Sequence, residues 1–137
     1  MVTINISYGE LADRLTILRL KKEMIEDPEK LHWIDQELPV LERKWDNALK
    51  DAQIKTTDEN LEAAKKEIIK LGWINKNLWQ IEDQIREYEN EGEFGVPFIH
   101  LARQVYQTND KRYESKQKID KLLNSFIREQ KSYNQYN

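Results

Sequence analysis

Hydrophobic residues recur every three or four positions along most of the chain, and the longest such run spans residues 57–91. Its apolar positions are Leu61, Ala64, Ile68, Leu71, Ile74, Leu78, Ile81, Ile85 and Tyr88. This spacing places them on one face of an α-helix, and no proline interrupts the run. At about 1.5 Å per residue such a helix is roughly 50 Å long, so other helices must run beside it. The pattern predicts an elongated all-α protein.

The first residues follow a different pattern. Val2, Ile4 and Ile6 alternate with polar residues, which predicts a short strand or extended arm over residues 1–7. A lone strand is marginally stable, so such an arm needs a partner, and the same arm of a second subunit is one candidate. Ser7 is then expected to cap a first helix, with Glu10 reaching back to complete a capping box.

A second helix is expected to begin at Asp27 and Pro28, because aspartate caps helices and proline fits their first turn. Its apolar seam repeats at heptad-like intervals over residues 31–49. Pro39 lies inside this seam and lacks a backbone N–H group, so we expect a kink or break near Glu37.

The second half of the chain predicts a long helical hairpin. Residues 56–59 cap the long helix, the glycine-containing segment 90–97 ends it, and Pro97 starts another helix. Asn109 or Asp110 then caps, or merely interrupts, a last helix, and residues 132–137 form a frayed tail. The expected architecture is one domain over residues 1–137. It is an elongated bundle of four or five helices on a long antiparallel hairpin, with the N-terminal arm attached.

Composition narrows the classes of function. The chain has no cysteine and two histidines, which excludes disulfides, thiolate metal sites and histidine-rich metal sites, and we predict no metal or cofactor. The net charge of −3 disfavours a nucleic-acid or membrane-surface binder. The charge is uneven, since residues 103–137 carry eight basic and four acidic side chains. No leader or membrane span is evident, which favours a cytoplasmic protein.

Twelve polar residues are candidates for a binding site because they cluster along predicted helices. They are Glu10, Asp13, Arg14, Lys21, Glu82, Asp83, Arg86, Arg103, Asn109, Asp110, Arg112 and Lys116. The plainer interpretation is structural, because Glu10 with Arg14 and Glu82 with Arg86 have the i,i+4 spacing of surface ion pairs.

Two chemical alternatives use the same residues. The acidic pairs at 10/13 and 82/83 could converge on a hard cation such as Mg²⁺, which prefers oxygen ligands. The basic residues around Tyr106, beside a helix N-terminus, could hold a phosphate or carboxylate group. Both signals are weak, because about a fifth of the chain is acidic and solvated charges explain the basic group.

Two segments resemble an uncharacterised all-helical family of bacteria and their phages. Residues 7–21 (SYGELADRLTILRLK) resemble the opening of its pattern. Residues 78–86 (LWQIEDQIR), 94–95, 101–103, 105–106 and 108–110, with Arg112 and Lys116, resemble its second half. The resemblance covers most of the chain except residues 40–70, and the twelve candidate residues fall within it. The chain departs from the pattern at Arg14, where the family has lysine, and at Pro39.

The resemblance implies a helical fold and no established reaction. Genes of that family often lie near glycosyltransferases for surface polysaccharides, which is an association and not a mechanism. The heptad seams, together with the absence of a catalytic constellation, favour a helical interaction or scaffold module that forms a homodimer. Its further partner could be a protein or a phosphorylated small molecule. The alternative is an enzyme or sensor for a phosphorylated or nucleotide-linked small molecule. A mutase-like enzyme would require a buried arginine pair.

Overall fold

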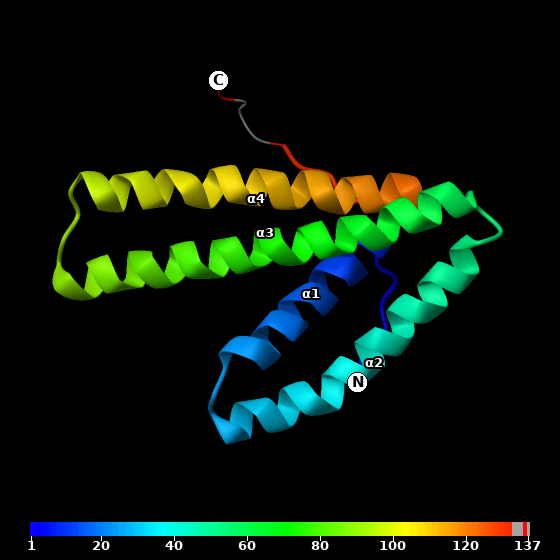
Figure 1. Ribbon diagram of the computed structural model, residues 1–137, viewed down its shortest axis with the longest axis horizontal. Coiled ribbons are helices and arrows are strands. Elements are labelled where there is room, and N and C mark those ends of the chain that lie inside the picture. The colour runs from blue at the N-terminus through cyan, green and yellow to red at the C-terminus, as the bar shows by residue number, and fades with distance from the viewer. Residues whose placement is uncertain (133–135, 137) are drawn as a thin grey trace.

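The computed structural model describes residues 1–132 and 136 (Figure 1). Four helices follow one another in the chain: α1 (Tyr8–Met24), α2 (Pro28–Ala52), α3 (Asp58–Glu91) and α4 (Val96–Leu122). No strand occurs within the described residues, so the all-α prediction is confirmed and the N-terminal strand is not formed. Most of the predicted tail, namely residues 133–135 and 137, lies outside the described residues.

The helices form two hairpins that diverge from one end of the molecule (Figure 1). Helices α3 and α4 run antiparallel and side by side, and α1 with α2 forms the second hairpin. Helix α1 packs against all three other helices, so it links the two hairpins. The Arg19 guanidinium binds both carboxylate oxygens of Glu42 at 2.8 and 2.6 Å, and Lys22 pairs with Asp35, which joins α1 to α2.

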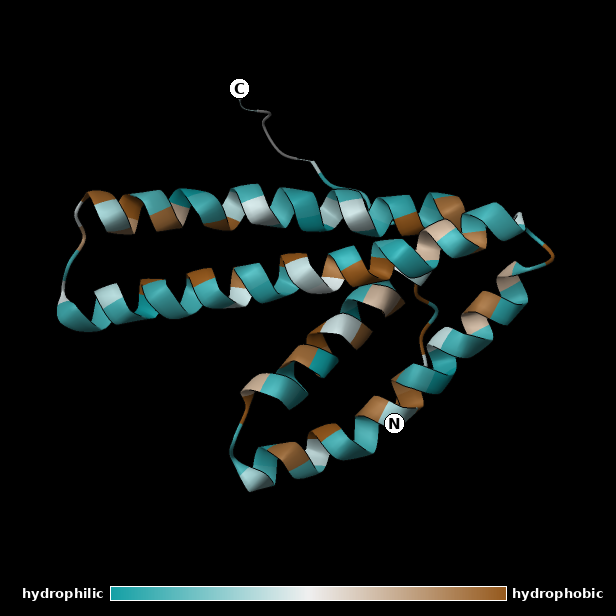
Figure 2. Ribbon diagram, viewed as in Figure 1, coloured by the Kyte–Doolittle hydropathy of each residue, from teal (hydrophilic) through white to brown (hydrophobic). Residues whose placement is uncertain are grey.

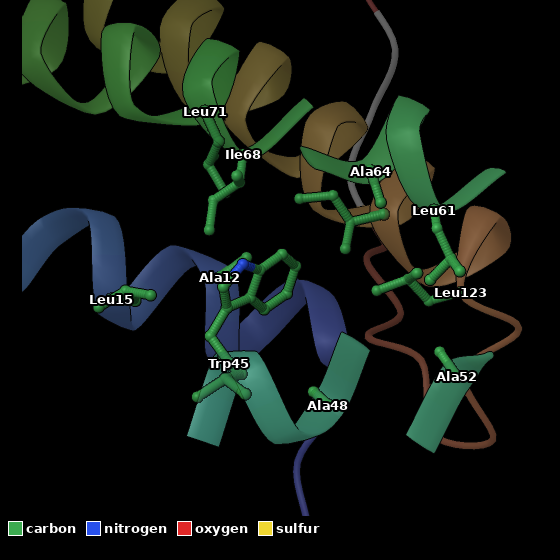
Figure 3. Close-up of a cluster of buried hydrophobic side chains, with 12 residues drawn as sticks. Ala12, Leu15, Trp45, Ala48, Ala52, Leu61, Ala64, Ile68, Leu71 and Leu123 are labelled. Carbon is green, nitrogen blue, oxygen red and sulfur yellow. The ribbon is translucent and has the colours of Figure 1, made fainter. Parts of the chain in front are cut away.

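The hydrophobic core lies where the two hairpins meet (Figure 3). Trp45 projects from α2 toward Ala12 of α1 and Ile68 of α3. Small residues, including Ala48 of α2 and Ala64 of α3, allow the helix backbones to approach closely. The hydrophobic cluster ends along α3 at Leu71, and the last polar contacts of α3 with α1 are made by Asn75 and Lys76. Beyond these residues α3 packs chiefly against α4.

Two predicted helix interruptions are absent. Helix α4 continues through Asn109 and Asp110, so residues 96–122 form one helix and neither residue acts as a cap. Helix α2 also continues through Pro39, so of the predicted kink or break near Glu37 the break is wrong, whereas the helix curves along its length (Figure 1). Because Pro39 has no N–H group, one carbonyl of the preceding turn lacks its helical hydrogen bond. Pro39 is exposed, so water can reach this carbonyl, and the helix bends instead of ending.

The predicted helix starts are in place. Ser7, Asp27 and Thr57 each accept a hydrogen bond from a backbone N–H of the first turn, at 3.0, 3.0 and 3.1 Å. Gly92 ends α3 with a φ of 68°, a left-handed conformation that favours glycine. The second half of the capping box is missing, because the Glu10 carboxylate binds Arg14 and Lys116 instead of reaching back to Ser7.

Candidate functional site

An ion pair between a buried aspartate and a half-buried arginine joins α1 to α4 near the core. Asp13 is 1% exposed, and the Arg112 guanidinium binds it with two parallel hydrogen bonds, Nε to Oδ1 at 2.8 Å and Nη2 to Oδ2 at 2.5 Å. These residues lie 99 positions apart. The bond to Asp13 raises the pKa of the Arg112 guanidinium above its ordinary value, against the effect of burial. Two charge-assisted bonds hold this pair in a single geometry.

Helix α3 contributes an amide to the same carboxylate. The Asn75 Nδ2 group donates to Asp13 Oδ1 at 3.1 Å and to Thr16 Oγ1 at 3.0 Å. The Thr16 hydroxyl in turn donates to the Asp13 carbonyl at 2.9 Å. Within the described part of the chain, the buried Asn75 Oδ1 atom has no hydrogen-bond partner. Sequence reasoning missed Asn75, although a polar residue beside the apolar stripe of the long helix was a usable signal.

Lys116 forms a second buried charge centre one turn further along α4. Its Nζ lies 2.8 Å from Glu10 Oε2, 2.8 Å from Glu129 Oε2 and 3.9 Å from Asp13 Oδ2. Burial alone lowers the pKa of the Lys116 ammonium, but the bonds to Glu10 and Glu129 outweigh it, so the pKa is raised. Glu129, from the segment after α4, was not among the sequence candidates.

Asp120 completes the contact between the start of α1 and α4. Its Oδ1 accepts a 2.7 Å hydrogen bond from the backbone N–H of Gly9. A Cβ atom on Gly9 would lie 2.2 Å from the Lys116 carbonyl oxygen, so a side chain does not fit there. Burial raises the pKa of the Asp120 carboxyl, and the bond from Gly9 opposes this shift only in part.

These contacts bring together a minority of the sequence candidates. We call the following set the polar junction: Glu10, Asp13, Asn75, Arg112, Lys116 and Asp120. Arg14 reaches its edge, because its Nε binds Glu10 Oε1 at 3.2 Å, as the i,i+4 spacing predicts. Asn109 and Asp110 lie half-buried on α4. The remaining candidates are exposed and lie outside the junction: Lys21, Glu82, Asp83, Arg86 and Arg103.

The junction is a network of paired groups and not an open site. Its carboxylates face guanidinium, ammonium or backbone N–H groups at hydrogen-bonding distance. Glu10 and Asp13 are therefore engaged by cationic side chains rather than converging with Glu82 and Asp83. Across the described residues, no group of three or more His, Asp or Glu side chains is arranged to hold a metal ion. This arrangement is best suited to a structural role, because its hydrogen bonds and ion pairs join α1 to α3 and α4.

A groove with basic side chains lies elsewhere between α3 and α4. We call it the basic groove; its volume is about 470 Å³, and it is lined by Glu67, Lys70, Ile74, Lys111, Glu114, Ser115 and Lys118. The buried Glu67 carboxylate accepts from Ser115 Oγ at 2.9 Å and pairs with Lys118 Nζ at 3.4 Å. In the described part of the chain, Lys70 and Lys111 make no ion pair within 4 Å.

The fold and the polar junction define an all-helical protein in which two helical hairpins are joined by buried charges. The chain belongs to a family of unknown function (DUF6165), whose profile matches residues 2–136. No curated protein and no solved structure matches it. None of the helices in the described residues combines the length and the apolar character that a membrane span needs.

Proposed function

We propose that this protein is a self-associating helical interaction module that presents half of its long hairpin as a docking surface. We call this half the distal hairpin; it comprises residues 77–109. Among the described residues, the hydrogen bonds and ion pairs from α1 reach no further than Lys76 on α3 and Arg112 on α4. Beyond these positions α3 and α4 pack chiefly against each other, and a pair of helices leaves apolar positions at the surface.

The observation that carries this proposal is the apolar surface at the end of the distal hairpin. Phe94, Val96 and Ile99 are 53%, 78% and 53% exposed, and the Phe94 ring packs edge-on against Phe98 with the centroids 5.2 Å apart. Figure 2 shows this hydrophobic colour at the start of α4, far from the core. Clustered apolar and aromatic residues on a surface mark protein interaction sites.

The polar junction supports the scaffold part of the proposal. An interaction module must hold its docking surface in a fixed position relative to the rest of the molecule. Buried charge pairs favour one arrangement of the hairpins, because any other arrangement leaves charges without partners.

The family resemblance supplies the proposed setting. We assign the module to the cytoplasm and to the assembly of surface-polysaccharide enzymes, because genes of the resembling family lie near such glycosyltransferases. Co-purification of a tagged chain with these enzymes from its own cells tests this assignment. Recovery of the same enzymes with a variant whose distal hairpin is disrupted would contradict a role for the docking surface.

Light scattering coupled to size-exclusion chromatography tests self-association directly. We expect the natural chain to elute with the mass of a dimer at micromolar concentration. The variant Val96→Ser/Ile99→Ser should elute as a smaller species, because it removes apolar surface from the distal hairpin. Trp33→Ser is the matched control, since Trp33 is 65% exposed on α2 and should leave the mass unchanged. A strict monomer for the natural chain would overturn the proposal.

The basic groove favours a second function, binding of a small phosphorylated or nucleotide-linked ligand. Lys70 and Lys111 are available there for a phosphate group, and the buried Glu67 could accept a hydrogen bond from a ligand hydroxyl. A thermal-shift screen with inorganic phosphate, nucleotides, nucleotide sugars and divalent ions tests it, because a ligand of the folded state raises its stability. Any shift should disappear in Lys70→Ala/Lys111→Ala. The absence of a shift in the natural chain would exclude this function for the compounds used.

A further inference from the structure

The side of α3 that packs against α1 continues along the distal hairpin without a cover. Asn75, Trp79, Glu82 and Arg86 follow one another at intervals of four, three and four residues, which places them on one face of the helix. Asn75 binds Asp13 and Thr16 of α1, so this face is directed toward α1. Beyond it Trp79 is half-buried, whereas Glu82 and Arg86 are exposed. We call these last three residues the open stripe.

The two charges of the open stripe have no partner in their own chain. Glu82 and Arg86 have the i,i+4 spacing at which a helix usually forms an ion pair. The structure shows no such pair, because neither residue has an opposite charge within 4 Å among the described residues. Both charged groups therefore remain available to a binding partner, beside the large apolar ring of Trp79.

This order of charges fits a second copy of the same chain. In a two-fold symmetric contact, residue i of one copy meets residue j of the other, and j meets i in return. If two α3 helices cross antiparallel with the two-fold axis level with residue 84 along the helix, Glu82 lies opposite Arg86 of the partner subunit. The symmetry then places Arg86 opposite Glu82 of the partner subunit. Two equivalent ion pairs form, flanked by Trp79 from each copy.

We propose that the open stripe is the contact by which two copies of this chain associate, through reciprocal pairing of Glu82 with Arg86. This inference rests on the self-association proposed above, and adds to its apolar surface a contact on α3 with a stated orientation and stated charge pairs. Charge complementarity selects the partner, because one helical stripe carries both signs in the order that an antiparallel copy requires.

Charge exchange tests the pairing. Glu82→Arg gives each copy two positive charges in the stripe, and Arg86→Glu gives two negative charges, so each single variant places like charges together. We expect the dissociation constant of the dimer to rise at least about tenfold in each, measured by sedimentation. The double variant Glu82→Arg/Arg86→Glu restores opposite charges at both contacts and should recover the dimer. An equimolar mixture of the two single variants should form a heterodimer.

A matched control lies on the same helix outside the stripe. Glu62 and Lys65 form an exposed ion pair at 2.9 Å in the first half of α3. Glu62→Arg and Lys65→Glu change the charge by the same amounts, so they should leave the dimer intact. Far-UV circular dichroism of each variant shows whether it remains folded, which separates loss of association from loss of structure.

The outcomes distinguish this inference from the proposal on which it depends. A monomeric natural chain would overturn both. A natural dimer that both single variants leave unchanged would overturn the open stripe as the contact, while self-association would stand. Dissociation of the single variants without recovery in the double variant would contradict reciprocal pairing and indicate a different protein partner or a different orientation.

Discussion

Gly9 lies where the first turn of α1 crosses the backbone of α4. Its N–H group donates to Asp120, and a Cβ atom would approach the Lys116 carbonyl to 2.2 Å. Gly72 provides a contrast within α3, because a Cβ there would lie 3.8 Å from Thr16 Cγ2, an ordinary contact. A side chain therefore does not fit at Gly9, whereas one fits at Gly72, and the sequence alone does not distinguish the two positions.

Gly9→Ala should therefore lower the free energy of unfolding by about 3 kcal/mol or more, since backbone atoms must move to relieve the overlap. Gly72→Ala should raise it by about 0.5–1 kcal/mol, because alanine restricts the unfolded chain and suits a helix interior. Urea denaturation followed by circular dichroism measures both. Equal effects of the two substitutions would contradict the close approach at Gly9.

Asp120 gives stability a dependence on acidic pH. Burial raises the pKa of its carboxyl above the ordinary 3.8. At pH values between 3.8 and the raised pKa of Asp120, the folded state binds more protons than the unfolded chain. The free energy of unfolding therefore falls as pH rises through this interval. Asp120→Asn keeps an oxygen acceptor for Gly9 N–H and removes the titration. Relative to the natural chain, we expect the variant to gain stability as pH rises from about 4 to 7.

Denaturation curves at several pH values in that interval measure the expected difference. The variant Asp46→Asn is a suitable control, because Asp46 is exposed on α2 and has no ion pair within 4 Å among the described residues. Parallel stability curves for the natural chain and Asp120→Asn would show that Asp120 does not titrate in this way.

At the scale of elements, the contact of α1 with α4 depends on buried charge. The Asp13 carboxylate accepts hydrogen bonds from Arg112 and from Asn75. Its removal therefore leaves the half-buried guanidinium and the buried amide group without this acceptor. Asp13→Ala should cost about 3–5 kcal/mol in the free energy of unfolding. Arg14→Ala removes only an exposed i,i+4 pair and should change it by less than about 0.5 kcal/mol.

Chemical denaturation of the two alanine variants checks this difference. The double variant Asp13→Ala/Arg112→Ala extends it, because the second substitution removes the stranded cation. Its destabilisation should be smaller than the sum of the two single effects. Simple additivity would mean that the two side chains do not interact in solution.

Helix boundaries illustrate how tertiary packing overrides local preference. Asn109 and Asp110 favour an interruption by side-chain hydrogen bonding to the backbone, but the penalty for such residues inside a helix is only a few tenths of a kcal/mol. Leu101 and Thr108 before them and Ile119 after them are buried on the same helix, and their packing exceeds that penalty. Capping residues such as Ser7 and Thr57 were predictable because their hydrogen bonds are local.

At the scale of the whole molecule, the distal hairpin extends away from the core and has no third helix beside it (Figure 1). If two copies cover this surface, association stabilises the folded state by mass action. The melting temperature should therefore rise with protein concentration in the natural chain and less so in Glu82→Arg. Circular dichroism melts over a hundredfold range of concentration measure this. A melting temperature independent of concentration would contradict stabilisation by association.

The sequence by itself determined the helical class, the helix starts and the apolar face of each helix, because hydrophobic spacing and capping are local properties. It also selected Asp13, Arg112 and Lys116, but only as members of a longer set. Their convergence was decided by the tertiary structure, since periodicity shows which residues share a helix face and not which faces meet. The glycine contact between α1 and α4 and the divergence of the hairpins brought Asp13 to Arg112, and they left Glu82 and Arg86 uncovered.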